Sequence, residues 1–364
     1  MAVYASNSNG RRFTLVLRIL LLALVLVSSA CSPFYVLRAG YEQAKILSRR
    51  QPITRMVEDP GTDPQTREKL RLVLDARDYA ARELGLNAGN SYTTYSWVDS
   101  DTLALVLSAA RKDDFRAHTW WFPIVGSVPY KGFFSERSAR REMARLEARG
   151  FDTYLRPTTA FSTLGWFNDP LMNTLLRYDS VGLANTVIHE LVHNTFYAAG
   201  QAQFNESFAN FAGSRGAIEF FCGREGEEAP RCRRARDGWH DELLFGRFLS
   251  AMVGELESLY AREDLTFEQK LATREEVFAR SQQEFRERVA PELRVARYRA
   301  FERERLNNAT LIARRLYYRD LDLFDRVYER YGGDLRLAIE AITAAARGAE
   351  DPFAAVKELL VSPG

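Results

Sequence analysis

The spacing of apolar positions changes along the chain, and each change indicates a different kind of structure. Over 35–50 and 63–84 apolar residues recur every three or four positions, which predicts helices. Over 91–169 short apolar runs alternate with Gly, Pro and Thr, which predicts a small sheet with one helix at 136–149. From 180 onward almost the whole chain has helical spacing. A sheet followed by a run of helices predicts an α+β fold.

Residues 1–30 have the pattern of a secretory signal peptide. Three arginines precede the apolar run 19–27, and small residues stand before Cys31. Arg18 limits the apolar run to fewer than the ~20 residues of a membrane span. Cys31 resembles the lipid-attachment cysteine of a bacterial lipoprotein, and Ser32 after it favours the outer membrane. We therefore predict a lipid anchor on Cys31 and a protein facing the periplasm; a plain signal peptide or an uncleaved anchor is the alternative.

Amino-acid composition excludes few classes of protein, but the net charge bears on nucleic-acid binding and the cysteines bear on a disulfide. Lys and Arg together number 50 and Asp and Glu 48, so the chain lacks the basic excess that indicates a nucleic-acid partner. Cys222 and Cys232 are the two cysteines that remain after Cys31. In an oxidising periplasm they favour a disulfide across a short polar loop, with two free thiols as the alternative.

The sequence HELVH, residues 189–193, carries the strongest chemical signal. On a helix predicted over 180–200, His189 and His193 lie one turn apart, so both imidazoles leave the same face. Glu190 is rotated by ~100° from them. Two imidazoles that hold Zn²⁺, with a carboxylate that takes a proton from the bound water, are the usual meaning of this motif. The alternative is a pair of core histidines, but a carboxylate beside them is costly to bury without a partner or a metal.

A third zinc ligand is expected on the next helix. Glu206 lies thirteen positions after His193, beyond a short turn and at the start of a second helix predicted over 204–221. It would face back toward the imidazoles and complete a His₂Glu set with one position left for water. The alternatives are that Glu206 is only a first-turn acid favoured by the helix dipole, or that His240 is the ligand. Asn210, one turn after Glu206, is expected to orient a ligand imidazole.

Several motifs together resemble a known family. They are, in order, YEQAKILSRRQPI, WWFPIVGSVPYKGFF, FSTLGWFNDPL, HELVHNTFY, FNESFA and LNNATL. HExxH followed by NExFA resembles the gluzincin metallopeptidases, and the full series resembles the bacterial putative aminopeptidase family, predicted zinc-dependent lipoproteins. The resemblance implies that His189, His193 and Glu206 bind zinc and that Glu190 is the catalytic acid and base.

The resemblance also suggests how a peptide would be held. Gluzincins often steady the oxyanion with a tyrosine or histidine, and Tyr317 is the first candidate here, Tyr318 the second; both are alternatively core aromatics. An edge strand that pairs with extended substrate is expected at Thr163, Leu164 and Gly165, where an ordinary loop is the alternative. The edge segment has no glutamate to hold a substrate's free amine.

These observations predict four segments: a signal peptide over 1–30, a helical segment over 31–90, a zincin-like catalytic core over 91–235 and a helical region packed on it over 236–364. The core would combine a small sheet with the HExxH helix and the Glu206 helix. The predicted function is a zinc metallopeptidase, an aminopeptidase by its family, that hydrolyses peptides in the periplasm. The alternative is a non-catalytic envelope lipoprotein whose helical half binds a protein partner.

Overall fold

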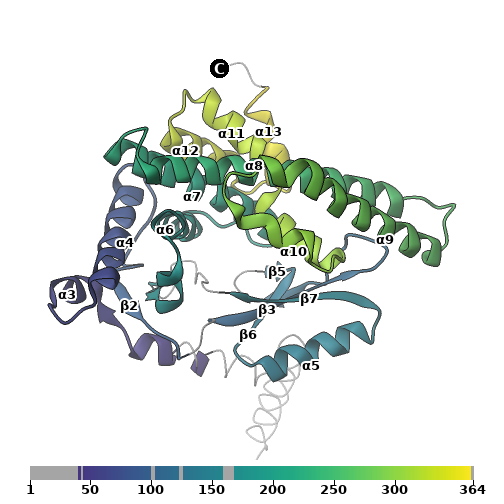
Figure 1. The fold of residues 1–364 in the computed structure, drawn as a ribbon, viewed down its shortest axis with the longest axis horizontal. Helices are drawn as coiled ribbons and strands as arrows, with labels where there is room; N and C mark the ends of the chain where they lie inside the picture. Colours follow the sequence, from purple (N-terminus) through teal and green to yellow (C-terminus); the bar gives the residue numbers. More distant parts are fainter. Residues whose placement is uncertain (1–39, 42–43, 100–102, 123–125, 159–167, 362–364) are drawn as a thin grey trace, which may run out of the picture.

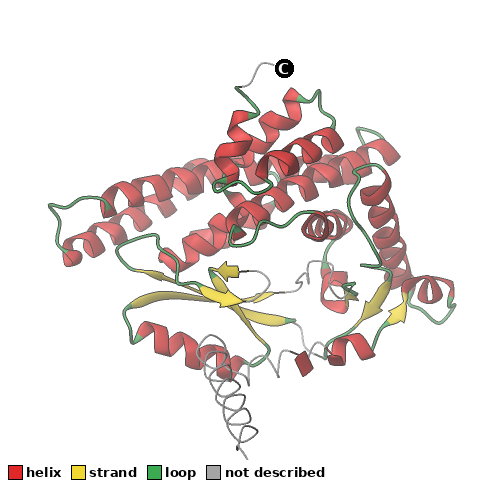
Figure 2. Ribbon diagram, turned by 180° about the vertical axis from the view of Figure 1, so that it is seen from behind, coloured by secondary structure: helices red, strands yellow, loops and turns green. Residues whose placement is uncertain are grey.

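The computed structural model describes residues 40–41, 44–99, 103–122, 126–158 and 168–361. Within these ranges the fold is α+β, as predicted, with small sheets and a mainly helical C-terminal half (Figures 1 and 2). None of the helices in the described ranges is long and apolar enough to cross a membrane. Cys31 and the predicted edge segment 163–165 lie outside the described residues.

The strands are short, and the helices account for most of the described residues. The strands are β1 (Gln51–Pro52), β2 (Thr94–Ser96), β3 (Ala104–Arg111), β4 (Trp120–Phe122), β5 (Gly126–Val128), β6 (Tyr130–Phe133), β7 (Phe151–Thr158) and β8 (Leu171–Met172). The helices are α3 (Ile53–Glu58), α4 (Pro64–Arg82), α5 (Glu136–Glu147), α6 (Ser180–Thr195), α7 (Ala202–Glu225), α8 (Pro230–Tyr260), α9 (Phe267–Glu284), α10 (Asn308–Tyr318), α11 (Leu321–Arg330), α12 (Leu335–Ala346) and α13 (Pro352–Glu358).

The sheet that matters most for the site has the order β6-β3-β7 and is antiparallel throughout. Helix α5 covers one face and α10 the other (Figure 2). Leu107 on β3 and Leu155 on β7 are cross-strand partners, and both pack toward Leu146 of α5. Because side chains alternate between faces, Arg156 and its partner Val106 point to the α10 side.

Helix α6 begins where its sequence allows a cap. The Asp179 carboxylate accepts a hydrogen bond from the Gly182 N–H at 2.8 Å. The helix ends at Thr195 rather than at Gly200, because the Phe196 backbone turns extended (φ −146°) and its ring packs on Phe204. Helix α7 consequently starts at Ala202, two residues earlier than the sequence predicts, and it runs on to Glu225.

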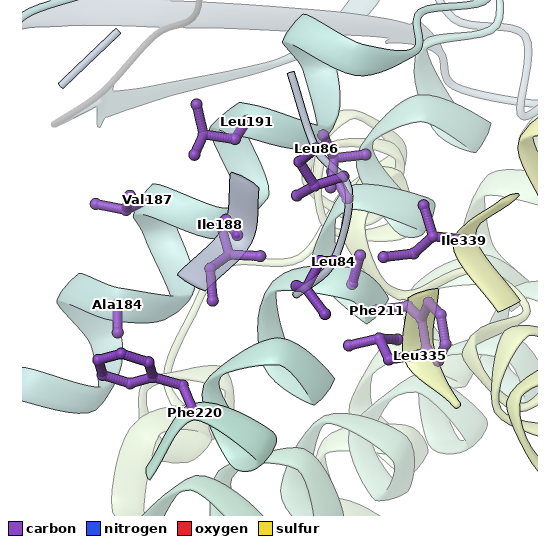
Figure 3. Packing of buried hydrophobic residues seen from close by; sticks show 14 of the residues in the cluster. Leu84, Leu86, Ala184, Val187, Ile188, Leu191, Phe211, Phe220, Leu335 and Ile339 are labelled. Atoms are coloured by element: carbon purple, nitrogen blue, oxygen red, sulfur yellow. The ribbon is translucent and has the colours of Figure 1, made fainter. Parts of the chain in front are cut away.

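A single large core joins segments that are far apart in the sequence. Leu84 follows α4, Ile188 belongs to α6, Phe211 to α7, and Leu335 and Ile339 to α12, and all five side chains meet in it (Figure 3). The core therefore includes residues from each of the three segments predicted after the signal peptide. The limit predicted at 235 falls inside α8.

A disulfide between Cys222 and Cys232 is present in the structure. It connects the last turns of α7 to the first turn of α8, with the two Cα atoms 4.7 Å apart. The bridge closes the short polar loop that separates these helices. It therefore holds the far end of α7, the helix that also carries Glu206.

Candidate metal centre

Three potential metal ligands converge between α6 and α7. The Nε2 atoms of His189 and His193 lie 3.4 and 3.7 Å from Oε2 of Glu206. The three ligand atoms all lie within 4.8 Å of one another. Donor atoms bound at ~2.1 Å to a tetrahedral zinc ion are ~3.4 Å apart, so this spacing fits such an ion. His240, the other candidate ligand, pairs with Asp241 at 3.2 Å instead and does not belong to this group.

The negative charge of Glu206 is stabilised by its neighbours. Burial alone would raise the pKa of this carboxyl group, but hydrogen bonds from His189 and His193 outweigh burial and hold the pKa well below its usual value. Glu206 is therefore a carboxylate at neutral pH, the form in which glutamate binds metal ions.

Asn205, the residue before Glu206, fixes the turn between the two helices. Its buried side chain accepts a hydrogen bond from the Ala198 N–H at 2.9 Å and donates one to the Ala198 carbonyl at 2.8 Å. Gly200, with φ +78°, supplies the left-handed backbone that reverses the chain. Glu206 is thus anchored by the residue next to it.

Close packing of α7 on α6 sets the distance between Glu206 and the histidines. Gly213 lies two turns after Glu206 and faces α6. A Cβ atom at Gly213 would lie 2.5 Å from Oδ1 of Asn185, 2.9 Å from its carbonyl oxygen and 3.1 Å from Cβ of His189. Only a residue without a side chain permits this approach of the two helices.

A Gly213→Ala substitution should therefore push the two helices apart. We expect the free energy of unfolding to fall by ~1–3 kcal/mol from overpacking, and metal binding to weaken as Glu206 moves. The matched control is Gly223→Ala on the exposed side of the same helix, where a Cβ atom would meet nothing within 4 Å. That change should stabilise the protein by up to ~1 kcal/mol. Denaturant unfolding and metal titration of both variants measure the difference; equal behaviour would contradict it.

Glu190 lies beside the ligand group without belonging to it. Burial raises the pKa of Glu190, against the opposing effect of the two imidazoles, and the charges of Glu206 and Asp169 raise it further. A carboxylate in such a place gains proton affinity. This is the property that a general base needs near neutral pH.

Tyr317 stands at the C-terminal end of α10, next to the ligands. Its ring centroid lies 6.3 Å from that of His189. Ser207 donates a hydrogen bond to the Leu316 carbonyl at 2.9 Å, so α7 ties down the end of α10 directly beside Glu206. Burial raises the pKa of Tyr317, so its hydroxyl keeps its proton and can donate it in a hydrogen bond. Tyr318, the second candidate, instead packs edge-on against Phe245 of α8.

Asn210 has partners other than the predicted imidazole. Its amide nitrogen lies 3.1 Å from the Tyr317 carbonyl and 3.3 Å from Oε2 of Glu242. Asn210 therefore helps to place Tyr317, and its hydrogen bonds within the described residues go to Tyr317 and Glu242 rather than to an imidazole. Within the described residues, Nδ1 of His193 is buried without a hydrogen-bond partner.

Three further residues of the site were not among the residues predicted from the sequence. Arg156 on β7 places Nη2 3.5 Å from the Tyr317 hydroxyl. Burial alone would lower the pKa of Arg156, but Tyr317 and Glu206 outweigh it and raise the pKa. Tyr130 and Tyr197 also lie within the electrostatic reach of Glu206, and burial raises the pKa of both, that of Tyr197 to about 12. Only the alternation of side chains along β7 could have suggested Arg156.

In the described residues, the α+β fold gathers two imidazoles and two carboxylates at one place. Residues 34–352 match the model of the family described as Putative aminopeptidase, so the chain belongs to this family, and this membership supports a peptidase-like function. No curated protein matches the chain significantly. No solved structure matches it either.

Proposed function

We propose that the protein is a zinc-dependent peptidase of the periplasmic face of the envelope. The observation that carries the proposal is the spacing of His189, His193 and Glu206, whose ligand atoms suit one divalent ion. Two neutral nitrogens and one carboxylate oxygen are a donor set that hydrolytic zinc sites use. Family membership supports the peptidase part of the proposal.

The residues around the ligands would divide the chemistry among them. When bound, zinc supplies a Lewis acid and lowers the pKa of a water molecule. Glu190 accepts a proton and returns it to the leaving amine, a role for which its raised pKa suits it. Tyr317 donates a hydrogen bond to the oxygen that becomes negative. Asn210 and Ser207 hold the end of α10 so that Tyr317 stays in place.

Metal removal tests this proposal. The purified mature protein should contain about one zinc ion per chain, because the chain offers a single set of three ligands in the described residues outside the disulfide. A chelator should abolish peptide hydrolysis and lower the melting temperature, and added zinc should restore both. Profiling a peptide library with and without chelator measures the first effect and also locates the cleaved bond. Hydrolysis that persists in metal-free protein would refute the proposal.

A further inference from the structure

Three side chains at alternate positions of β7 face α10, and two of them have charged partners. Asp152 forms a buried ion pair with Arg274, with Nη1 and Oδ2 2.7 Å apart. Tyr154 interacts with Glu304. Arg156, the third, is the one closest to the metal ligands.

Among the described residues, no carboxylate forms an ion pair with Arg156. In the part of the chain that the structure describes, its polar contact is the Tyr317 hydroxyl, and its Cζ lies 5.8 Å from the centroid of the Tyr317 ring. Glu206, whose charge acts on Arg156, is already engaged by His189 and His193. A guanidinium carries five N–H donors, and in the described residues the partly buried Arg156 uses its side chain to reach only the Tyr317 hydroxyl. Its other donors can therefore bind an anionic group of a ligand.

The position of Arg156 indicates which part of a ligand it would meet. Arg156 contacts Tyr317, and the Tyr317 ring lies beside that of His189. Tyr130 is close enough for both Arg156 and Glu206 to affect its pKa. The guanidinium therefore lies one side chain away from the ligand group, a distance that one or two residues of a bound peptide can span.

We propose that Arg156 binds the terminal carboxylate of a short peptide substrate. This inference rests on the proposed function and names the substrate class of the same site. A guanidinium pairs with a carboxylate through two parallel hydrogen bonds, which suits a free chain end better than a neutral amide. A terminal carboxylate near the cleaved bond leaves one or two residues between that bond and the carboxyl end. If cleavage also removes the amino-terminal residue, as the family description suggests, the preferred substrates are peptides of two to a few residues.

Trialanine and trialanine amide test the proposal, since they differ only at the chain end. For the wild-type protein, kcat/KM should be at least ~10-fold higher for the acid than for the amide. Arg156→Gln should remove this preference, mainly by raising KM for the acid, so that kcat/KM for the acid and for the amide become equal within about twofold. Arg156→Lys, which keeps the charge, should retain part of the preference. Arg116→Gln is the control, because Arg116 is exposed and pairs with Asp114, two residues away on the surface.

Measurements of peptide binding test the role of Arg156 independently of the proposed peptidase function. Zinc-loaded Glu190→Gln protein, with and without Arg156→Gln, is titrated calorimetrically with both peptides. If the acid binds more tightly than the amide and this difference depends on Arg156, the proposal is supported. Failure of every peptide to be hydrolysed would refute only the peptidase function. Equal affinity for acid and amide, or an equal loss of both activities in Arg156→Gln, overturns it. Arg156-dependent binding of Ala-Glu-Ala amide, without a preference for trialanine over its amide, would overturn the assignment to the chain end in favour of an acidic side chain.

Discussion

Replacing Glu190 with glutamine should lower kcat for peptide hydrolysis by ~10³-fold and leave zinc binding unchanged. Glutamine has almost the same shape and cannot accept a proton. Glu190 lies next to the ligand group but is not one of its members, so the ion should keep its three protein ligands. Steady-state kinetics on a cleaved peptide and metal analysis of the same preparation measure the two quantities together.

The control for this variant is Glu225→Gln at the far end of α7. Glu225 pairs with Arg231 on the surface, and its loss should affect neither zinc content nor turnover. A Glu190→Gln protein with wild-type turnover would exclude Glu190 as the base. A Glu190→Gln protein that lost its zinc would instead make Glu190 part of the metal site.

A Glu206→Gln variant should lose both metal and activity, whereas Glu190→Gln should lose only activity. A neutral amide oxygen is a much poorer zinc ligand than a carboxylate, and we expect zinc affinity to fall by more than ~100-fold. The imidazoles of His189 and His193 also lose the charge that lies 3.4 and 3.7 Å from them. Competition with a fluorescent zinc chelator measures the affinity.

The same Glu225→Gln protein is the control for Glu206→Gln, since both substitutions remove one carboxylate from α7. If Glu206→Gln protein bound zinc as tightly as wild type, the proposed ligand set would be wrong. If Glu206→Gln protein kept its zinc but lost activity, Glu206 would act in the hydrolytic step rather than in metal binding. The two glutamate variants therefore assign separate roles to residues only sixteen positions apart.

The centre of the site could be predicted because its residues are close in sequence. A four-residue spacing on a helix places His189 and His193 on one face, and a short turn returns Glu206 to them. The α+β class followed equally from the change in apolar spacing at about residue 180. The helix end was less predictable: packing of Phe196 against Phe204 stops α6 before the glycine at which local sequence alone would stop it.

The substrate side of the site could not be derived in the same way. Arg156 and Tyr317 meet through contact between a strand and a helix that are more than 150 positions apart, and no local pattern encodes such a contact. Tyr317 was found through family resemblance, and Arg156 was missed. Asn210 has the predicted position one turn after Glu206, but its partners are decided by α8 and α10. The lipid anchor on Cys31 and the edge strand over 163–165 stay predictions.

The two hydrogen bonds between Asn205 and Ala198 bear on the order in which the parts of the site form. Both histidines, Glu206 and their connecting turn lie in one continuous stretch of the chain, so the proposed metal site is complete once two neighbouring helices have paired. Tyr317 lies on α10, more than a hundred positions after Glu206 in the sequence. Ion uptake can thus precede catalytic competence, and half-assembled molecules would carry metal without being able to cut peptides.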